Sequence, residues 1–416
     1  METKNLAMSK IKIENFGPIK EGIQKNGDWI DIKKVTVFIG NQGSGKSSVA
    51  KLISTLTWIE KALVRGDFQE KELTIYNRFK KHCAYQNIGN YFKDDTFIEY
   101  QGKAYSITYK DGNTFVKKNS ENGYAFPKIM YVPAERNFVS SVDKPASLKK
   151  LPNTLYTFLD EFEDAKQDLK GNLDLPIGNA RFEYSKQNKI SYIVGDDFKI
   201  RLSESSSGFQ SFVPLFLVTR HLADSINKEH DASIKQISIE EEKRIRKEIE
   251  SILSNPNLTE DIKNTALEVL SSRFKYACFI NIVEEPEQNL YPSSQRGTLN
   301  SLVKFANMDE GNKLIMTTHS PYIINYLTLA VKAYKVSVKL EPSNNKVELR
   351  TQLNELVPLT STINPDDLVI YELDDKGNIK MLDNYKGIPS DENELNEKLV
   401  EANDLFVNLI SLEKSI

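Results

Sequence analysis

A glycine-rich segment between a strand pattern and a helix pattern constrains this chain more than any other feature. It has the sequence GNQGSGKS over residues 40–47 and matches G-x-x-x-x-G-K-[ST] in full. The run VTVFI before it is typical of a buried strand, and residues 46 to about 65 have a helical pattern. Glycines let backbone N–H groups curve around phosphate oxygens, and a helix N-terminus attracts negative charge. The segment predicts a nucleotide-binding site formed by Gly40, Asn41, Gln42, Gly43, Ser44, Gly45, Lys46, Ser47 and Ser48.

Within this segment two side chains have expected roles of their own. Lys46 is expected to reach the β- and γ-phosphates of ATP, and the Ser47 hydroxyl is expected to coordinate Mg²⁺. The alternative is a glycine-rich turn that happens to precede Lys-Ser, and the strand before it and the helix after it argue against that alternative.

Composition limits the classes of protein to which the chain can belong. Its 416 residues include 55 Lys and Arg against 58 Asp and Glu, so the net charge of −3 gives no global basic excess for nucleic acid. Two cysteines cannot build a disulfide framework or a Cys-rich zinc site, and they indicate a reducing compartment. No apolar run approaches the roughly 20 residues of a membrane helix. We expect a cytoplasmic protein that makes no membrane contact.

Two later apolar runs end in residues suited to phosphate chemistry. Residues 276–283 precede Glu284 and Glu285, and residues 313–317 precede His319. Both runs are expected to be central parallel strands, so these side chains should share one sheet edge. Glu284 would then face the Mg²⁺ shell, Glu285 would act as the general base on water, and His319 would sense the γ-phosphate. A solvated strand end and a structural histidine are the alternatives.

A serine-rich segment, residues 205–210, leads directly into a predicted helix from Gly208 to Asp224. The Ser207 hydroxyl, the Gly208 backbone and the helix N-terminus together offer an anion-binding site. Taken alone, the segment could equally be a Ser-rich linker.

In this order the motifs resemble those of ABC-type ATPases of the SMC and RecF group. Residues 206–210 fall over the family's Leu-Ser-Gly-Gly-Gln signature, with Ser206 in place of Leu and Phe209 in place of Gly. Glu284 stands where the family's Walker B strand usually ends in Asp. The resemblance implies ATP hydrolysis with Mg²⁺. It also implies that Ser207 and Gly208 bind the γ-phosphate of a nucleotide held by another subunit, which requires a homodimer or higher homo-oligomer with composite ATP sites.

Two further segments have positions in the same resemblance. Asn289 and Leu290 fall where the family has the D-loop that crosses to the partner's site. Glu135 and Arg136 follow a predicted strand, where a loop that links the nucleotide to outside partners is expected. A surface turn is the alternative for Glu135 and Arg136.

The fold class expected is α/β, an ABC-type P-loop ATPase head with a mixed sheet. Short alternating stretches over residues 91–118 and 181–202 predict an antiparallel β subdomain. The expected division is an N-terminal lobe with phosphate loop, β subdomain and signature (1–225), a helical insertion (226–275), a C-terminal lobe with Walker B and His319 (276–335) and a C-terminal α/β extension that forms a partner interface (336–416).

This plan also resembles ATPases of prokaryotic anti-phage defence systems, namely Septu-type, PARIS-type or OLD-like proteins without a TOPRIM module. The stretch from Glu372 to Gly377 has a hairpin-turn sequence rather than the metal-binding pattern of TOPRIM, and the four histidines form no HNH pattern. A separate effector protein, a nuclease or a toxin, is therefore expected to supply the output.

Two other functions fit the sequence. One is a RecF-like ATPase of repair or recombination that binds DNA itself; the densest basic run, Arg78 to His82, also fits a solvated helix face. The other is a scaffold that binds ATP without hydrolysing it. The charged run 240–248 of the insertion fits either a solvated helix face or an arm that docks a partner.

Overall fold

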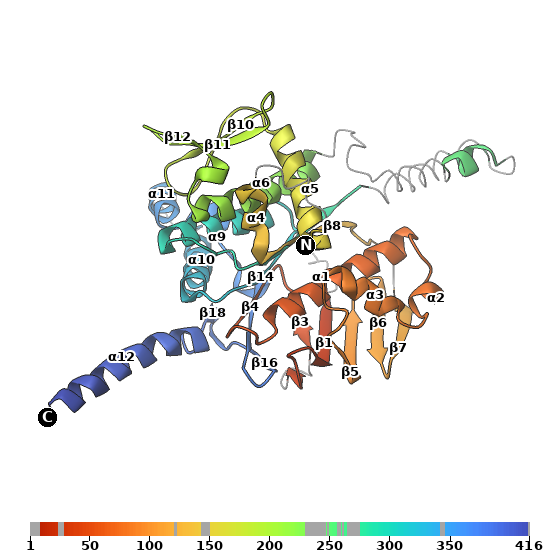
Figure 1. Cartoon of the computed structure of the whole chain (residues 1–416), viewed down its shortest axis with the longest axis horizontal. Helices are drawn as coiled ribbons and strands as arrows, with labels where there is room; N and C mark the ends of the chain where they lie inside the picture. Colours follow the sequence, from red (N-terminus) through yellow and green to blue (C-terminus); the bar gives the residue numbers. More distant parts are fainter. Residues whose placement is uncertain are drawn as a thin grey trace.

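The computed structural model shows a body of sheets and helices from which the C-terminal helix projects (Figure 1). The residues that it describes are 9–23, 29–119, 123–142, 150–228, 247, 249–255, 259, 262–263, 275–341 and 346–414.

A mixed sheet of seven strands forms the centre of the fold, in the order β2-β16-β15-β4-β14-β13-β8. The five strands from β15 to β8 run parallel to one another, and β16 is antiparallel to β15. Their side chains are mostly buried, as expected for a sheet covered on both faces. The bounds are Gly22–Ile23 (β2), Asn378–Met381 (β16), Leu368–Leu373 (β15), Val35–Gly40 (β4), Lys313–Thr317 (β14), Cys278–Glu284 (β13) and Pro127–Val132 (β8).

Alternate side chains of β4 point into two different cores because successive residues of a strand face opposite sides. Val35, Val37 and Ile39 pack among residues of α5, α6, α9 and α10. Phe38 faces the other way, into a core formed with α1 and an antiparallel sheet. The helices in question are α1 (Lys46–Arg65), α5 (Asn153–Asp168), α6 (Ser207–Lys228), α9 (Pro292–Ala306) and α10 (Pro321–Leu340).

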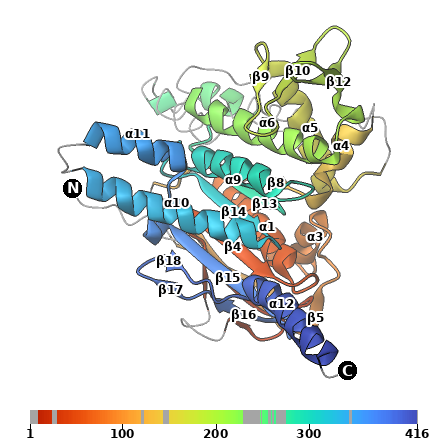
Figure 2. The same cartoon turned by 90° about the vertical axis from the view of Figure 1, so that its left-hand side faces the viewer.

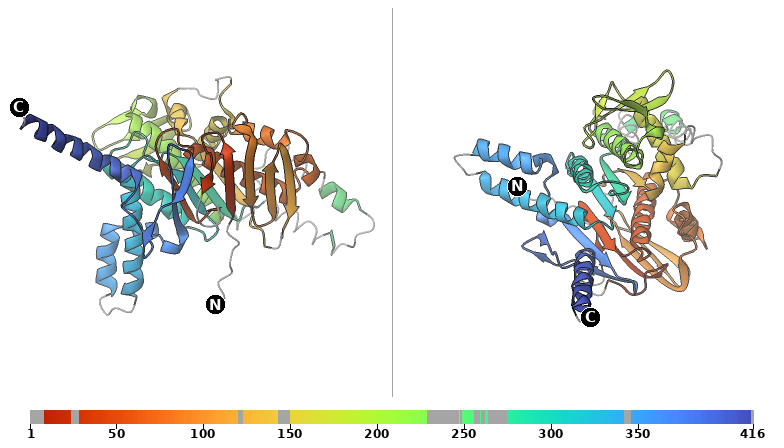
Figure 3. Two further views of the ribbon diagram at one scale, coloured as in Figure 1. Left: turned by 90° about the horizontal axis from the view of Figure 1, so that it is seen from below. Right: turned by 60° about the vertical axis from the view of Figure 1, so that its left-hand side comes forward.

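The antiparallel sheet beside α1 has the strand order β3-β1-β5-β6-β7 (Figure 3, left). Two short helices, α2 (Glu70–Leu73) and α3 (Arg78–Tyr85), lie beside it. The strand bounds are Ile30–Asp31 (β3), Lys10–Phe16 (β1), Phe92–Gln101 (β5), Tyr105–Lys110 (β6) and Asn113–Lys118 (β7).

A smaller lobe packs on the side of α6 that faces away from the central sheet (Figure 2). It contains α4 (Phe138–Ser141), α5 and a four-stranded antiparallel sheet in the order β12-β11-β10-β9. These strands are Leu173–Asp174 (β9), Arg181–Ser185 (β10), Ile190–Val194 (β11) and Lys199–Arg201 (β12).

Beyond β14 the chain returns to the central sheet and then leaves the body. The helices α10 and α11 (Lys346–Leu356) lie side by side, and β15 and β16 follow them (Figures 2 and 3). After the small hairpin of β17 (Asn384–Tyr385) and β18 (Ile388–Pro389), α12 (Glu394–Glu413) projects away from the molecule.

The structure confirms the predicted fold class: an α/β P-loop head with a mixed sheet and antiparallel sheets. The stretches 91–118 and 181–202, for which the sequence predicts one antiparallel subdomain, lie in two separate sheets, the first with β5 to β7 and the second with β10 to β12. The predicted strands at 35–39, 276–283 and 313–317 and the helix from Lys46 are present, and Asp374 to Gly377 form the predicted β15–β16 turn. Most of the helical insertion, including the charged run 240–248 apart from Lys247, lies outside the described residues. The domain division stays a prediction, although residues 368–381 of its C-terminal extension complete the central sheet beside β4. Over the residues described, no helix is long and apolar enough to span a membrane.

Candidate functional site

The phosphate loop connects the end of β4 to the start of α1, as its sequence predicts. Gly40, Gly43 and Gly45 have φ angles of 137°, 82° and 106°, which only glycine adopts readily. A Cβ atom at Gly40 would lie 2.1 Å from the carbonyl oxygen of Leu373, the last residue of β15. The close approach of β15 to the loop therefore fixes a glycine at this position.

Lys46, the first residue of α1, is held inside the loop. Its side chain is 5% exposed, and its ammonium donates to the carbonyl oxygens of Gly40 (2.9 Å) and Asn41 (2.7 Å). Burial lowers the pKa of Lys46 to about 8, although the carboxylates of Glu285 and Glu287 oppose the shift. The ammonium is thus poorly solvated, and a bound anion would stabilise its charge.

The serines of the loop suit a phosphate ligand. Ser44 Oγ is buried and, among the described residues, makes no hydrogen bond. Such a hydroxyl is costly in a folded protein unless a ligand or water satisfies it. A Cβ atom on Gly43 would meet no neighbour within 4 Å, so the loop is open on that side. These features, with Ser47 half-buried in the first turn of α1, fit a nucleoside triphosphate and its Mg²⁺.

The predicted acids and histidine lie at the same edge of the sheet as the loop. In the register of the parallel strands, Glu284 of β13 is opposite Thr317 of β14, and Thr317 is opposite Phe38 of β4. Thr318 then donates its N–H to the Phe38 carbonyl oxygen (3.0 Å). The loop that carries His319 is therefore hydrogen-bonded to the strand that leads into the phosphate loop.

Glu284 is 5% exposed and is bound by neighbouring protein groups. Its carboxylate accepts a hydrogen bond from the Tyr131 hydroxyl and one from the backbone N–H of Ala134 (3.2 Å). Lys51 Nζ lies 3.9 Å from the same carboxylate, on the second turn of α1. Glu284 is thus anchored between β8 and α1.

Glu285 and His319 form a pair that remains partly accessible. His319 Nε2 lies 3.5 Å from Glu285 Oε1, and about a third of each side chain is exposed (34% and 35%). The hydrogen bond from His319 holds the pKa of the Glu285 carboxyl below its ordinary value, so the carboxylate is ionised at neutral pH. Glu285 has a φ of 44°, and its N–H donates to the Thr317 carbonyl oxygen (2.9 Å). The left-handed backbone at Glu285 thus ends β13, and its hydrogen bond to Thr317 ties the residue to the end of β14.

Arg136 is a site residue whose role the sequence did not reveal. Its side chain is fully buried, so neither a surface turn nor a contact with outside partners describes it. Its guanidinium donates to the carbonyl oxygens of Glu284 and Glu285, each at 2.6 Å, and to that of Ser211 on α6 (3.2 Å). Arg136 therefore fixes the backbone of both acids and joins it to α6.

Glu287 is a second residue that sequence reasoning missed. Its carboxylate accepts from the Thr318 hydroxyl (2.8 Å) and from the His319 N–H (2.7 Å). Burial raises the pKa of this carboxyl. Glu287 thus ties the loop after β13 to the loop of His319. The sequence did contain a signal for it, because Glu287 is the third carboxylate within four residues of the apolar run 276–283.

The signature segment lies on the other face of the central sheet from α1. Ser207 begins α6 and is exposed, and α6 packs against α5 and α9. A Cβ atom at Gly208 would lie 3.0 Å from the Asn289 carbonyl oxygen, so α6 starts directly against the predicted D-loop. The structure thus brings Glu284, Glu285 and His319 together with the phosphate loop, and it places Ser207 and Gly208 on a separate, solvent-facing helix start.

Comparison with known protein families supports a protein of a nucleotide-dependent class. A family model described as an AAA ATPase domain matches residues 266–324, the segment that carries Glu284, Glu285 and His319. No curated protein matches the chain.

Solved structures of SMC heads are similar over most of the chain. The SMC head domain from Thermotoga maritima is 12% identical, with a TM-score of 0.34, covering 77% of this chain and 91% of that one. An Smc head domain with an extended coiled coil, bound to the C-terminal domain of ScpA and derived from Pyrococcus furiosus, is 9% identical, with a TM-score of 0.36, covering 96% and 99%.

Proposed function

We propose that this protein is an ATPase that binds ATP at the phosphate loop and hydrolyses it to ADP and phosphate. The observation that carries the proposal is the shared sheet edge. The loop after β4, the His319 loop after β14 and the acids after β13 follow three neighbouring parallel strands. Ligands of open α/β sheets bind at the carboxyl ends of the strands.

Each side chain has a part in this proposal. Lys46 and the loop N–H groups bind the phosphates, and the ionised Glu285 carboxylate takes a proton from the attacking water. His319 orients Glu285 and faces the γ-phosphate. Ser47 and Glu284 would hold Mg²⁺, which supplies charge neutralisation at the phosphates.

The proposal extends to a composite site between two copies of the chain. Ser207 and Gly208 of one copy would bind the γ-phosphate held by the phosphate loop of the other. The exposure of Ser207 and of Tyr291, which is 77% exposed just after the predicted D-loop, supports this arrangement. Hydrolysis then removes the charges that bridge the copies, and the dimer loosens.

At the level of the cell, the ATP-gated dimer would control a separate effector, a nuclease or toxin of an anti-phage defence system. Only the resemblance of the motif order and domain plan supports this finer role. Assaying the chain with and without a co-expressed neighbouring gene product tests it.

The Glu285→Gln variant tests the hydrolytic step. Removing the base should lower the rate of phosphate release by about a hundredfold or more, while ATP binding is retained. Phosphate release and nucleotide binding are to be measured on the same purified chain, with Glu183→Gln on the exposed β10–β12 sheet as the control. Hydrolysis by Glu285→Gln at the wild-type rate would remove Glu285 from this role.

A further inference from the structure

The C-terminal helix α12 carries an apolar stripe that remains exposed in the described part of the chain. Four side chains on one side of the helix form this stripe, and each is between 56% and 63% exposed: Leu399, Leu405, Phe406 and Leu409. Adjoining apolar side chains in solvent are typical of a site where another molecule binds. The stripe is therefore a candidate interaction surface.

The first turn of α12 is fixed to the body, and the stripe extends beyond it. Asn393 is buried, and its side chain accepts a hydrogen bond from the Asn396 N–H (3.1 Å). The Glu394 N–H donates to the Glu372 carboxylate of β15 (2.5 Å), and Leu395 packs against the core. The rest of the helix projects from the body (Figure 1). A helix anchored in this way presents its stripe to another molecule.

A groove with a volume of about 500 Å³ lies between the C-terminal half of α10 and the hairpin of β17 and β18. Its lining includes the apolar side chains of Val336, Val338, Pro365 and Ile388, and Val338 is 53% exposed. Amphipathic helices bind other proteins by placing their apolar face in a groove of this kind. The groove is therefore a candidate binding surface for a helix.

Four lysines also line the groove: Lys332, Lys335, Lys339 and Lys386. The three on α10 are three and four residues apart, so they share one face of that helix. Lys335 donates a hydrogen bond to the main-chain oxygen of Lys386, which joins α10 to the hairpin. No carboxylate belongs to this lining, and no ion pair within the described residues involves the four lysines.

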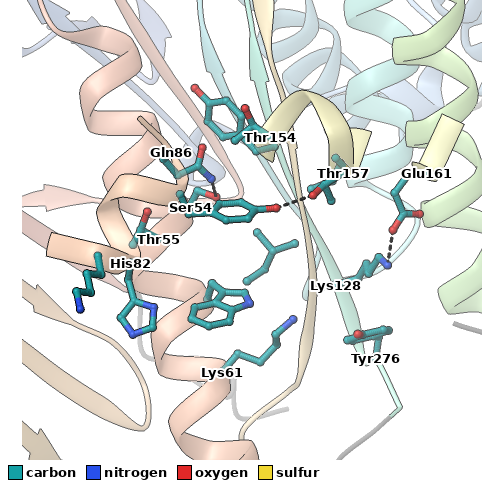
Figure 4. Close-up of a pocket in the computed structure, with 16 residues that line it drawn as sticks. Ser54, Thr55, Lys61, His82, Gln86, Lys128, Thr154, Thr157, Glu161 and Tyr276 are labelled. Carbon is teal, nitrogen blue, oxygen red and sulfur yellow. Dashed lines mark hydrogen bonds and ion pairs between the residues drawn. The ribbon is translucent and has the colours of Figure 1, made fainter. Parts of the chain in front are cut away.

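The carboxylate that follows α10 does not balance these lysines. Glu341 is paired instead with Lys346 and with Arg350 (2.8 Å). The cavity between α1, α3, β8 and α5 differs in this respect, because its Lys128 is paired with Glu161 (2.7 Å), as Figure 4 shows. The groove at α10 therefore keeps an excess of positive charge and suits an acidic partner.

The charge of α12 has the opposite sign. The helix contains five acidic residues and one lysine: Glu394, Glu397, Glu401, Asp404 and Glu413 against Lys398. Two α12 helices would repel each other, whereas α12 and the groove attract each other. Within one chain, α10 and α11 extend to one side of the body and α12 extends to another (Figure 2). The groove that fits the stripe is thus the groove of a second copy.

We propose that the α12 stripe of one chain binds in the α10 groove of a second copy of this chain. The contact joins two unlike surfaces, and every chain carries one of each kind. Two chains that exchange their α12 helices close the assembly, and otherwise it continues to further chains. The contact needs no nucleotide, and it is separate from the proposed ATP-dependent dimer at the start of α6.

Sedimentation of the full chain without nucleotide measures this association. Phe406→Glu should raise the dissociation constant about tenfold or more, because it places a charge within the stripe. Asn408→Glu adds the same side chain on the opposite side of α12 and should change the constant by less than about twofold. Equal effects of the two variants, or a wild-type chain that stays monomeric up to roughly 100 μM, would overturn the proposal.

Charge reversal tests the groove. Lys332→Glu combined with Lys339→Glu should also weaken the association about tenfold or more, because like charges then face each other. Lys170→Glu combined with Lys186→Glu makes the same change in net charge on the exposed surface of the smaller lobe and is the control. Equal weakening by the two pairs would show that only net charge matters, and would refute the groove.

Mixing two defective chains distinguishes the groove from a pairing of α12 with α12. The Phe406→Glu chain keeps its groove, and the chain with Lys332→Glu and Lys339→Glu keeps its stripe. Neither should associate alone, but the mixture should form a one-to-one pair. If the groove variant associated alone and the mixture formed no such pair, α12 would bind α12 and the proposal would be wrong.

The Ser207→Arg variant separates this contact from the proposed ATP-dependent dimer. Without nucleotide, its self-association should equal that of the wild-type chain. Loss of association in Ser207→Arg would assign the contact to the start of α6 and overturn the proposal.

Discussion

Arg136 shows how one side chain can set the geometry of a site without touching its ligand. Its guanidinium reaches the main-chain oxygens of Glu284, Glu285 and Ser211, which belong to the end of β13 and to α6. Burial lowers the pKa of Arg136 to about 10, but the group remains charged at neutral pH. Hydrogen bonds from a buried charged donor are among the stronger ones in proteins.

The Arg136→Met variant should therefore unfold more easily and lose phosphate-release activity. Leaving these buried carbonyl oxygens without a donor is expected to cost about 3 kcal/mol. Thermal or urea unfolding measures the loss, and Arg201→Met, on a half-exposed surface pair, is the matched control. If the two variants had the same unfolding midpoint, Arg136 would not support the site.

The lowered pKa of Lys46 makes nucleotide binding depend on pH. With a pKa of about 8 in the free loop, Lys46 loses its proton as the pH rises above 8, and an anionic ligand raises the pKa again. Binding of ATP should then take up a proton above pH 8, and affinity should fall by up to tenfold per pH unit.

Calorimetry of ATP binding at pH 9, in buffers of different ionisation enthalpy, measures that proton uptake. Lys46→Arg, whose charge does not titrate in this range, is the control and should show no uptake. If the wild-type chain took up no proton at pH 9, the pKa of Lys46 would not be lowered.

The lowered pKa of Lys46 also predicts how stability depends on pH. The unfolded chain keeps this proton to about pH 10.5, so the contribution of Lys46 to stability rises between about pH 8 and 10.5.

Among the elements, β15 and α12 differ most in what they contribute to the fold. Every residue of β15 is buried and the strand lies directly beside β4, which leads into the phosphate loop. The side chains of α12 from Glu397 onward are mostly exposed. The two segments are separated by β16, β17 and β18, and only the first turn of α12, through Leu395, packs against the core.

Truncations separate these contributions. A chain that ends at residue 367 should fail to fold. It would lose β15, one of the two strands paired with β4, and this loss would expose the core that lies between the central sheet, α1 and the antiparallel sheet. A chain that ends at residue 397 should keep its free energy of unfolding within about 1 kcal/mol of that of the full chain. Circular dichroism during thermal unfolding checks both, and a cooperatively folded 1–367 chain would show that β15 is dispensable.

For the molecule as a whole, the proposed dimer is the feature that decides the mechanism. Ser207→Arg should abolish phosphate release and spare ATP binding by Lys46 of the same chain, because the added side chain blocks the start of α6 only for a second copy. Thr351→Arg, on the exposed face of α11, is the control. Phosphate release and light scattering with ATP measure the effect. Unchanged turnover by a strictly monomeric Ser207→Arg variant would exclude a composite site.

Local sequence patterns were sufficient for part of this fold. The phosphate loop, the strands that end at Glu284 and Thr317 and the helix from Lys46 could be predicted because each depends on residues close in sequence. The place of β15 beside β4 could not, because strand order depends on long-range packing. The roles of Arg136 and Glu287 could not be predicted for the same reason, since their partners come from other loops.

Arg136 binds main-chain carbonyl oxygens at the end of β13 and not the carboxylates there. The groups that it holds in place are therefore different from the groups that are proposed to react. Replacing either acid leaves the atoms that Arg136 holds in place. Substitutions of Glu285 should thus report on its proposed role in proton transfer with little distortion of the main chain, whereas substitutions of Glu284 also remove the acceptor of the Tyr131 hydroxyl and of the Ala134 N–H.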